Sequence, residues 1–447
     1  MEVKDKLKVE IVDLSYDGLG VAKVDGYIIF VDECLVGEKV LIEITDLGKN
    51  YGFAKKIDVL KPSPYREKPK CPHFGICGSC ELMHLDYKQQ LMFKKKVVVE
   101  TIKKVGHIDE LEIDKIVGMD NPYNYRNKIQ MPFAYNKKAI FGYYKKKSHE
   151  VVSIEKCYLQ PDEMTEIVKF IKNLCNEYNV SIYNEITGKG ILRHVLVRKN
   201  YKDEFMVVLI TNGSTMFHIE DIVQKVVSRY PNVKSIYQNI NMKKNNVILG
   251  EHSKLLFGQK TLEEKLCDLY FDVSYQSFFQ VNREQTEKLY NLVLEYADAN
   301  PKTSIIDAYC GVGTISLMLA KKAKFVYGIE VVREAIINAN ANAKKNQILN
   351  TKFIVGKVED KINDYVSDEV NTIVVDPPRK GLDQNVVKTL LNSNIKRIVY
   401  VSCNPTSLAR DLNLLKEKFE IKKCSIVDMF CQTVGVETVV LLSKINA

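Results

Sequence analysis

The residues best suited to chemistry in this sequence are a cysteine and a glutamate near its carboxyl end. Cys403 directly follows an apolar run of strand type, IVYVS, and precedes Asn404 and Pro405. In an open α/β sheet, ligands and reacting groups collect where strands end, so Cys403 is a candidate nucleophile. Glu437 lies near the start of the last apolar run, VETVVLLSKI, where a carboxylate is rarely present for packing. We therefore take Glu437 as a candidate base.

Other polar groups follow neighbouring strands and suggest a cofactor. The run SIIDAYCGVGT combines a strand, a glycine turn that lets the backbone approach a ligand, and the start of a helix. Glu330 ends the next strand, where a carboxylate can bind both ribose hydroxyls of a nucleoside. The sequence has neither the third glycine of a dinucleotide site nor a Gly-Lys-Ser/Thr phosphate loop, which favours S-adenosylmethionine over NAD or ATP. Asp376, Pro377 and Pro378 end a further strand, and the prolines fix an extended loop.

The thiol of Cys403 distinguishes two kinds of base methylation, that of an exocyclic amine and that of a ring carbon. An Asp-Pro-Pro loop also fits enzymes that methylate an exocyclic amine, but those need no thiol. C5 of uracil is a poor nucleophile until a thiolate adds at C6, and a base must later remove the C5 proton so that the thiol can leave. Cys403 and Glu437 match these two needs. A base-amine methyltransferase, or an RNA-binding protein without turnover, remains the alternative.

A second group of cysteines predicts a metal site. Three cysteines lie in the pattern C-x5-C-x2-C, and a fourth lies far downstream in IEKCYL. Four thiolates can complete a zinc site or hold an iron–sulfur cluster, and the spacing leaves both open, with His73 and His84 as further zinc ligands. The expected ligands are Cys71, Cys77, Cys80 and Cys157.

Length and composition agree with a cytoplasmic enzyme that binds a polyanion. The 447 residues suffice for about three domains, and 46% hydrophobic with 27% charged residues is typical of a soluble globular protein. The net charge of +9 suits nucleic acid. Neither a signal-peptide core nor a membrane span is expected, since the most apolar stretch, 304–320, contains Asp307 and two glycines. In a reducing compartment the 11 cysteines are not expected to form disulfides.

The elements that must position these groups fall into three predicted domains. Residues 1–60 alternate apolar and polar residues with glycines at the corners, which predicts a small OB-type barrel. Residues 61–269 begin with a proline-rich linker and continue as a mixed α+β region, with helices expected near 85–110, 161–178 and 217–230. From residue 270, strands alternate with helices, which predicts a doubly wound, mostly parallel sheet closed at its edge by the final apolar run.

Basic and aromatic residues in the first two domains predict an RNA surface, because rings can stack on bases and cations neutralise phosphates. Residues 121–147 interleave several tyrosines with basic side chains, and a later strand-rich segment adds more. The candidates are Lys49, Tyr51, Phe53, Lys55, Lys56, Arg126, Lys128, Lys145, Lys146, Lys147, Arg193, His194 and Arg198.

Along nearly its whole length the sequence resembles the RNA (uracil-C5)-methyltransferase family, whose members modify tRNA or 23S rRNA. The barrel is similar to that family's TRAM domain, and the four cysteines match the ligands of its [4Fe–4S] cluster. SFFQVN, DAYCGVGT, the strand ending in Glu330, DPPRKG and VSCNP are similar to its methyltransferase motifs. The resemblance implies a Rossmann-like class I methyltransferase domain in which Cys403 is the nucleophile and Glu437 the base. It implies that Gln280, Tyr309, Glu330 and Asp376 bind S-adenosylmethionine.

The cluster and the barrel favour 23S rRNA over tRNA as substrate, and a monomer is expected. One segment departs from the family pattern: MFCQTVGVE has Cys431 in place of a proline and Gly435 in place of a histidine. This departure bears on the shape of the loop before Glu437 and on any role of that histidine in positioning the target.

Overall fold

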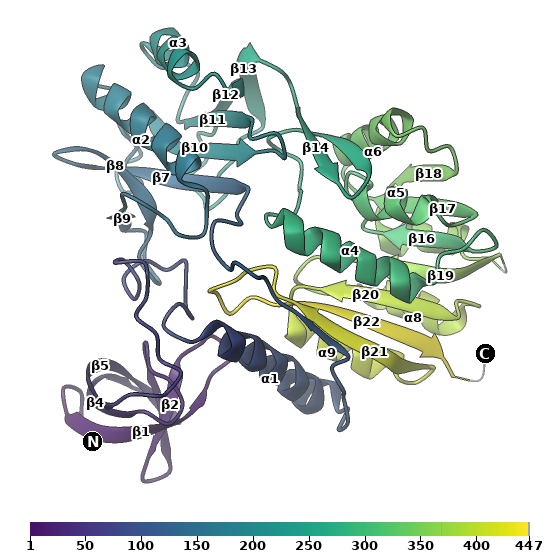
Figure 1. The fold of residues 1–447 in the computed structure, drawn as a ribbon, viewed down its shortest axis with the longest axis horizontal. Coiled ribbons are helices and arrows are strands. Elements are labelled where there is room, and N and C mark those ends of the chain that lie inside the picture. The colour runs from purple at the N-terminus through teal and green to yellow at the C-terminus, as the bar shows by residue number, and fades with distance from the viewer. Residues whose placement is uncertain (368, 446–447) are drawn as a thin grey trace.

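The computed structural model describes residues 1–367 and 369–445, which form a barrel, a seven-stranded sheet and an eight-stranded sheet (Figure 1). The barrel is closed in the order β1-β2-β3-β5-β4, and alternate residues such as Ile29, Val40 and Ile42 fill its interior. This confirms the OB-type barrel. Its strands are β1 (Lys6–Leu14), β2 (Gly20–Val24), β3 (Tyr27–Val31), β4 (Lys39–Leu47) and β5 (Tyr51–Lys61).

The middle region is α+β, as expected. Its sheet has the order β13-β12-β11-β10-β7-β8-β9, and α2 and α3 bury apolar side chains such as Ile171 and Ile222 in a core shared with it. A separate hairpin, β14-β15, leads to the last region. The elements are α1 (Tyr87–Gly106), β6 (Lys115–Val117), β7 (Lys128–Asn136), β8 (Lys138–Tyr144), β9 (Val151–Ser153), α2 (Asp162–Glu177), β10 (Leu192–Lys199), β11 (Phe205–Thr211), α3 (Ile219–Arg229), β12 (Val233–Ile240), β13 (His252–Gly258), β14 (Leu262–Leu266) and β15 (Leu269–Val273).

The carboxyl-terminal region is a doubly wound sheet in the order β18-β17-β16-β19-β20-β22-β21-β6. Neighbouring strands from β18 to β20 are parallel, and the strand order reverses between β16 and β19, where such sheets bind ligands. Its elements are α4 (Arg283–Ala297), β16 (Ser304–Ala308), α5 (Thr314–Ala320), β17 (Phe325–Glu330), α6 (Arg333–Lys345), β18 (Thr351–Val355), α7 (Val358–Lys361), a 3-10 turn (Ile362–Asp364), β19 (Val370–Val375), α8 (Gln384–Asn392), β20 (Arg397–Ser402), α9 (Pro405–Leu415), β21 (Phe419–Val427) and β22 (Glu437–Lys444).

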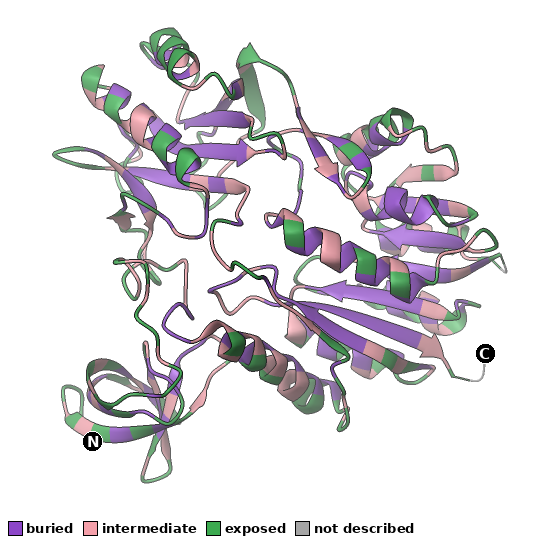
Figure 2. Ribbon diagram, viewed as in Figure 1, coloured by how far each residue is buried: buried purple, intermediate pink, exposed green. Residues whose placement is uncertain are grey.

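Both faces of this sheet are covered, as a parallel sheet requires. Successive residues of β20 enter different cores: Ile398 and Tyr400 pack with α1, α8 and α9, whereas Val399 and Val401 pack with α4 and α5. Figure 2 shows the central strands buried over most of their length and α4 exposed along one side. The sheet thus lies between two apolar cores, one on each face.

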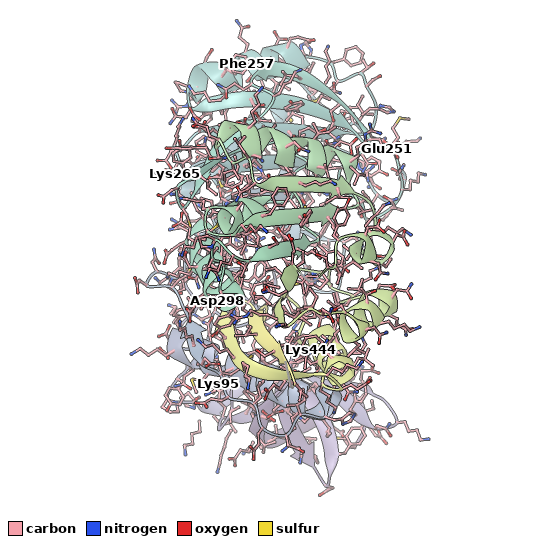
Figure 3. All side chains as sticks on the ribbon, turned by 90° about the vertical axis from the view of Figure 1, so that its right-hand side faces the viewer. Lys95, Glu251, Phe257, Lys265, Asp298 and Lys444 are labelled. Carbon is pink, nitrogen blue, oxygen red and sulfur yellow. The ribbon has the colours of Figure 1, made fainter. Side chains whose placement is uncertain are left out.

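The expectation that β22 forms the edge of this sheet is wrong. β22 lies between β20 and β21, and the last strand of the sheet in the described chain is β6, which pairs in parallel with β21. The first six residues of β22 are all buried, which fits a strand with neighbours on both sides. α1 docks on the same region through Val98 and Ile102, so residues 87–117 pack with the carboxyl-terminal sheet. In the view of Figure 3, Lys95 of α1 lies between Lys444 of β22 and the barrel.

Candidate functional site

The sheet brings the two predicted reactive residues opposite each other. β20 and β22 are antiparallel with Ser402 paired to Thr438, so the next position sets Cys403 against Glu437. β19 lies on the other side of β20, and Asp376 is the first residue after it. Three neighbouring strands therefore deliver a thiol and two carboxyl groups to one edge.

The charges at this edge influence one another. Burial raises the pKa of Glu437 well above its usual range, Asp376 raises it further, and the Arg379 guanidinium opposes both. Burial also raises the pKa of Asp376 to about 7. The pKa of the Cys403 thiol is raised by burial first and then by Glu437 and Asp376, again against Arg379. Arg379 thus favours the thiolate, and the carboxylates disfavour it.

The two loops at the edge are tied together by side chains. Asn404 caps α9, because its Oδ1 accepts from the Thr406 N–H at 3.0 Å, and its Nδ2 donates to the Arg379 carbonyl at 3.0 Å. Asp411 of α9 accepts from the Leu382 N–H at 2.7 Å. The Asp-Pro-Pro loop is therefore held against the loop that carries Cys403.

The glycine turn after β16 is built to approach a ligand. Tyr309, Gly311 and Gly313 have φ of 68°, 54° and 84°, and a Cβ on Gly311 would meet none of the described atoms within 4 Å. Glu330 accepts from the Gly311 N–H at 3.2 Å and from the Val332 N–H at 2.9 Å, which fixes its carboxylate beside the turn. The space over the turn can thus admit a cofactor.

Gln280 is largely buried in the loop that leads into α4. Its carbonyl accepts from Asn127 Nδ2 at 3.1 Å, which joins this loop to the middle region. Gln280 is thus fixed through its backbone.

Three further residues belong to this edge and were missed as site residues. Asp307 of β16 is fully buried, accepts from the Ser316 hydroxyl at 2.5 Å, and has an Oδ1 without a hydrogen-bond partner among the described residues. Burial raises its pKa to about 7. Tyr290 of α4 hydrogen bonds with Thr314 at 3.0 Å, and burial raises its pKa, with smaller contributions in the same direction from Asp376, Asp307 and Glu437. The third, Arg379, directly follows Asp376, Pro377 and Pro378, so the motif itself points to it.

The loop with the two unusual residues is closely packed. Cys431 is fully buried, and its carbonyl accepts from the Tyr125 hydroxyl at 3.1 Å. A Cβ on Gly435 would lie 3.1 Å from the Phe430 ring, so a larger residue there requires that ring to move. Gly435 therefore allows a compact turn directly before Glu437.

The four predicted metal-binding cysteines line one cavity, together with Phe74, Met83 and Tyr143. His73 also lines it, whereas His84 is buried outside it, with its ring 5.0 Å from that of Phe74. Over residues 1–367 and 369–445, no three His, Cys, Asp or Glu side chains form a group that could hold a single metal ion. The structure thus brings the four predicted cysteines to one cavity.

The basic and aromatic candidates range from exposed, through partly buried ones such as Phe53, Arg126 and Lys128, to buried. Phe30, Tyr51 and Phe53 form mutual ring contacts on the barrel, and Lys147 lies 5.0 Å from the Phe53 ring centroid. Arg193, His194 and Arg198 are buried instead and cannot form a surface. Arg198, for example, donates to the Ser277 carbonyl at 2.8 Å. No helix in the described part of the chain could cross a membrane.

Comparisons with known proteins agree with this architecture. The family model for tRNA (uracil-5-)-methyltransferase matches residues 86–445, and the TRAM domain model matches residues 2–57. An uncharacterized RNA methyltransferase from Clostridium acetobutylicum is 42% identical over 98% of this chain and 97% of its own. Another from Staphylococcus aureus is 42% identical over 97% of both chains.

Among solved structures, the tRNA (uracil-54, C5)-methyltransferase of Pyrococcus abyssi, bound to S-adenosyl-L-homocysteine, is similar to this chain. The TM-score is 0.80 at 28% identity, and the match covers 97% of this chain and 99% of the other. The similarity therefore includes all three regions.

Proposed function

We propose a mechanism for this chain from one premise: it belongs to the tRNA (uracil-5-)-methyltransferase family and is an S-adenosylmethionine-dependent RNA (uracil-5-)-methyltransferase. The observation that carries the proposal is the cross-strand position of Cys403 against Glu437, beside Asp376. The cysteine is the nucleophile and the glutamate the base.

The reaction begins when the Cys403 thiolate adds to C6 of the uracil, which forms a C6–S bond and moves an electron pair toward C5. S-adenosylmethionine supplies the methyl group that C5 takes up. Glu437 then removes the C5 proton, the electron pair re-forms the C5–C6 double bond, and the C6–S bond breaks to return the thiolate. Arg379 supports the first step, because its charge favours the thiolate.

The residues that we propose to bind S-adenosylmethionine include two groups at the turn after β16, Glu330 and Gly311. Glu330 accepts the ribose hydroxyls, and the open face of Gly311 lets the backbone approach the ligand. Tyr309, Gln280 and Asp376 complete the set, as the family resemblance implies. Asp376 would then face both the cofactor and the reacting base.

We propose that the four-cysteine cavity holds a [4Fe–4S] cluster. The donor set of four thiols is the one such clusters use, and the cavity wall of Phe74, Met83 and Tyr143 is apolar or aromatic. The cluster would join residues 71–80 to Cys157 and so stabilise the middle region. We assign it no step in methyl transfer.

We propose that Phe30, Tyr51, Phe53 and Lys147 form part of the RNA surface. Their rings lie together on the barrel, Tyr51 is 48% exposed, and Lys147 extends this surface from the middle region. Stacking on rings beside a cation is a general way to hold single-stranded RNA. The target uridine must leave its stack to reach Cys403.

The test is tritium release from RNA labelled at uridine C5, with S-adenosylmethionine present, for the wild type and Cys403→Ala. Release by the wild type that disappears in the variant supports the covalent mechanism. Methylation that persists in Cys403→Ala would point to amine methylation, and RNA binding without any release would point to a binding protein. Cys175→Ala, a buried cysteine of α2, is the matched control.

The same assay identifies the substrate. We propose 23S rRNA first, as the cysteine site and barrel suggested, and tRNA second, because the Pyrococcus abyssi enzyme acts on tRNA and matches this chain throughout. Labelled transcripts of both should be compared at one salt concentration, since RNA affinity depends strongly on salt.

A further inference from the structure

The segment that follows Cys80, residues 81–94, packs against the loop that leads into Glu437 and hydrogen bonds to it. Several side chains of residues 81–94 hydrogen bond to residues 428–434. The two segments lie more than 300 positions apart in the chain. Contacts of this kind fix the direction from which β22 begins. They therefore bear on where the Glu437 carboxylate lies.

The centre of this contact is a pair of buried glutamines. Gln90 Nε2 donates to Gln432 Oε1 at 3.0 Å, and the Gln432 N–H donates back to Gln90 Oε1 at 3.2 Å. Each side chain belongs to a residue only 1% exposed. Gln432 has φ of 69°, a conformation that costs free energy in a residue other than glycine and that the surrounding contacts must maintain.

The contact begins at the residue directly after Cys80. The Glu81 N–H donates to the Gln432 carbonyl at 3.2 Å, and Glu81 Oε2 accepts from the Val434 N–H at 3.3 Å. The Leu82 N–H donates to the same carbonyl at 3.0 Å. The thiol of Cys80 is thus one residue away from groups that hold the loop.

A buried ion pair anchors the other end of the loop. Lys94 Nζ lies 2.5 Å from Asp428 Oδ1 and donates to the Phe430 carbonyl at 3.0 Å. The Tyr87 hydroxyl donates to Asp428 Oδ2 at 2.7 Å. Removal of one partner from such a pair leaves an uncompensated charge, so the geometry is strongly enforced.

We propose that residues 81–94 position the base, Glu437, and that Gln90 is the main positioning residue. Through this segment, the four-cysteine site affects the rate at which Glu437 removes the C5 proton. The proposal rests on the proposed role of Glu437. The loop that carries Cys403 is held differently, by Asn404 and the Arg379 carbonyl. Disturbing Gln90 should therefore slow proton removal and leave thiol addition and methyl transfer largely intact.

The test compares Gln90→Met with Gln238→Met, using Glu437→Gln as the reference for loss of the base. Gln238 is a glutamine 3% exposed in β12 that hydrogen bonds to Thr211 and Ser214, remote from the loop in the fold. Two rates are measured in a single turnover: methyl transfer to RNA, and tritium release from uridine C5. The covalent RNA–protein adduct is quantified on denaturing gels.

For Gln90→Met we expect tritium release to fall about tenfold or more while methyl transfer changes less than about threefold, so the adduct accumulates. Gln238→Met should match the wild type in all three readouts. Tyr87→Phe, which removes only a hydroxyl, should give a smaller change in the same direction and covers the case in which Gln90→Met folds poorly.

Amide hydrogen exchange provides a readout independent of activity. Exchange in residues 428–436 should accelerate in Gln90→Met and in Cys80→Ser, and not in Gln238→Met. If Glu437→Gln traps no adduct, the proposed role of Glu437 fails. If Glu437→Gln traps adduct but Gln90→Met and Tyr87→Phe behave like Gln238→Met, the role of Glu437 stands and the positioning proposal is overturned.

Discussion

The two cysteine sites of this chain are built in opposite ways. Cys403 lies at the end of a central strand, and the register of β19, β20 and β22 brings its neighbours to it. The four thiols around the second cavity come from the irregular segment 71–80 and from Cys157, and only Cys77 forms an isolated bridge, with Lys145. Backbone hydrogen bonds between strands align the first site, whereas the proposed cluster would link the segments that carry the second.

This difference predicts where each substitution acts. Cys403→Ser should lower methyl transfer by about 10³-fold or more, because the nucleophile acts together with the base, and should leave the thermal midpoint nearly unchanged. The measurements are single-turnover methyl transfer and thermal unfolding by circular dichroism. A large loss of stability would contradict the view that the Cys403 thiol serves the reaction and not the fold.

Cys157→Ser should show the converse pattern. We expect loss of bound iron and of visible absorbance, and a fall of about 2 to 5 kcal/mol in the free energy of unfolding if the cluster joins its segments as a cross-link does. Binding of S-adenosylmethionine, measured by calorimetry, should change little. Iron content equal to that of the wild type would remove Cys157 from the ligand set, and removal of iron by a chelator should reproduce the variant.

A third prediction concerns the buried carboxyl of Asp307. Because its pKa is about 7 in the folded protein and lower when unfolded, the unfolded chain binds fewer protons between these values, and stability falls as pH rises. Asp307→Asn removes this dependence. The free energy of unfolding of the variant relative to the wild type should therefore rise by about 1 to 3 kcal/mol from pH 5 to pH 8. Urea titrations at both pH values measure it, and a parallel pH dependence in the two proteins would argue against an ionising Asp307.

The smallest effect is expected at Arg379, which is exposed. Arg379→Ala removes the cation that lowers the pKa of Cys403, so the thiolate fraction falls. Alkylation of Cys403 by iodoacetamide at pH 8 should slow by a few fold, as the charge is partly screened by solvent. Lys380→Ala, a change in the next exposed cation, is the control. Faster alkylation in Arg379→Ala would mean that steric access, and not charge, limits the reaction.

The strand ends of the methyltransferase region were predictable from the sequence, because each is a short apolar run that stops at a polar residue. Asp376, Cys403 and Glu330 were found in that way. The position of β22 was not, because apolar periodicity says nothing about which strand pairs with which. β6 could not be predicted from the sequence either, because three residues carry no periodic signal. Its register also depends on β21, at the other end of the chain.

The candidate site was predicted in its residue types and less well in its electrostatics. Asp307 lies in the predicted strand SIIDA, but only the fold shows its buried oxygen without a hydrogen-bond partner among the described residues. Likewise, the basic residues of β10 belong to a strand that is almost fully buried, so charge alone could not separate a binding surface from an interior hydrogen bond. The four cysteines were recognised by spacing, and the fold adds the cavity that they share.

The parallel pairing of β6 with β21 has a consequence for synthesis. Asp114 Oδ2 accepts from the Cys424 N–H at 2.7 Å across 310 residues, and α1 buries Val98 and Ile102 in the core that includes α9. On the ribosome, α1 emerges long before its partners are synthesised. Its apolar side chains therefore stay without their native contacts during most of translation. Native contacts this distant in sequence delay folding and leave such side chains open to chaperones or aggregation. The last strands to be made are therefore the ones that allow some of the first residues to fold.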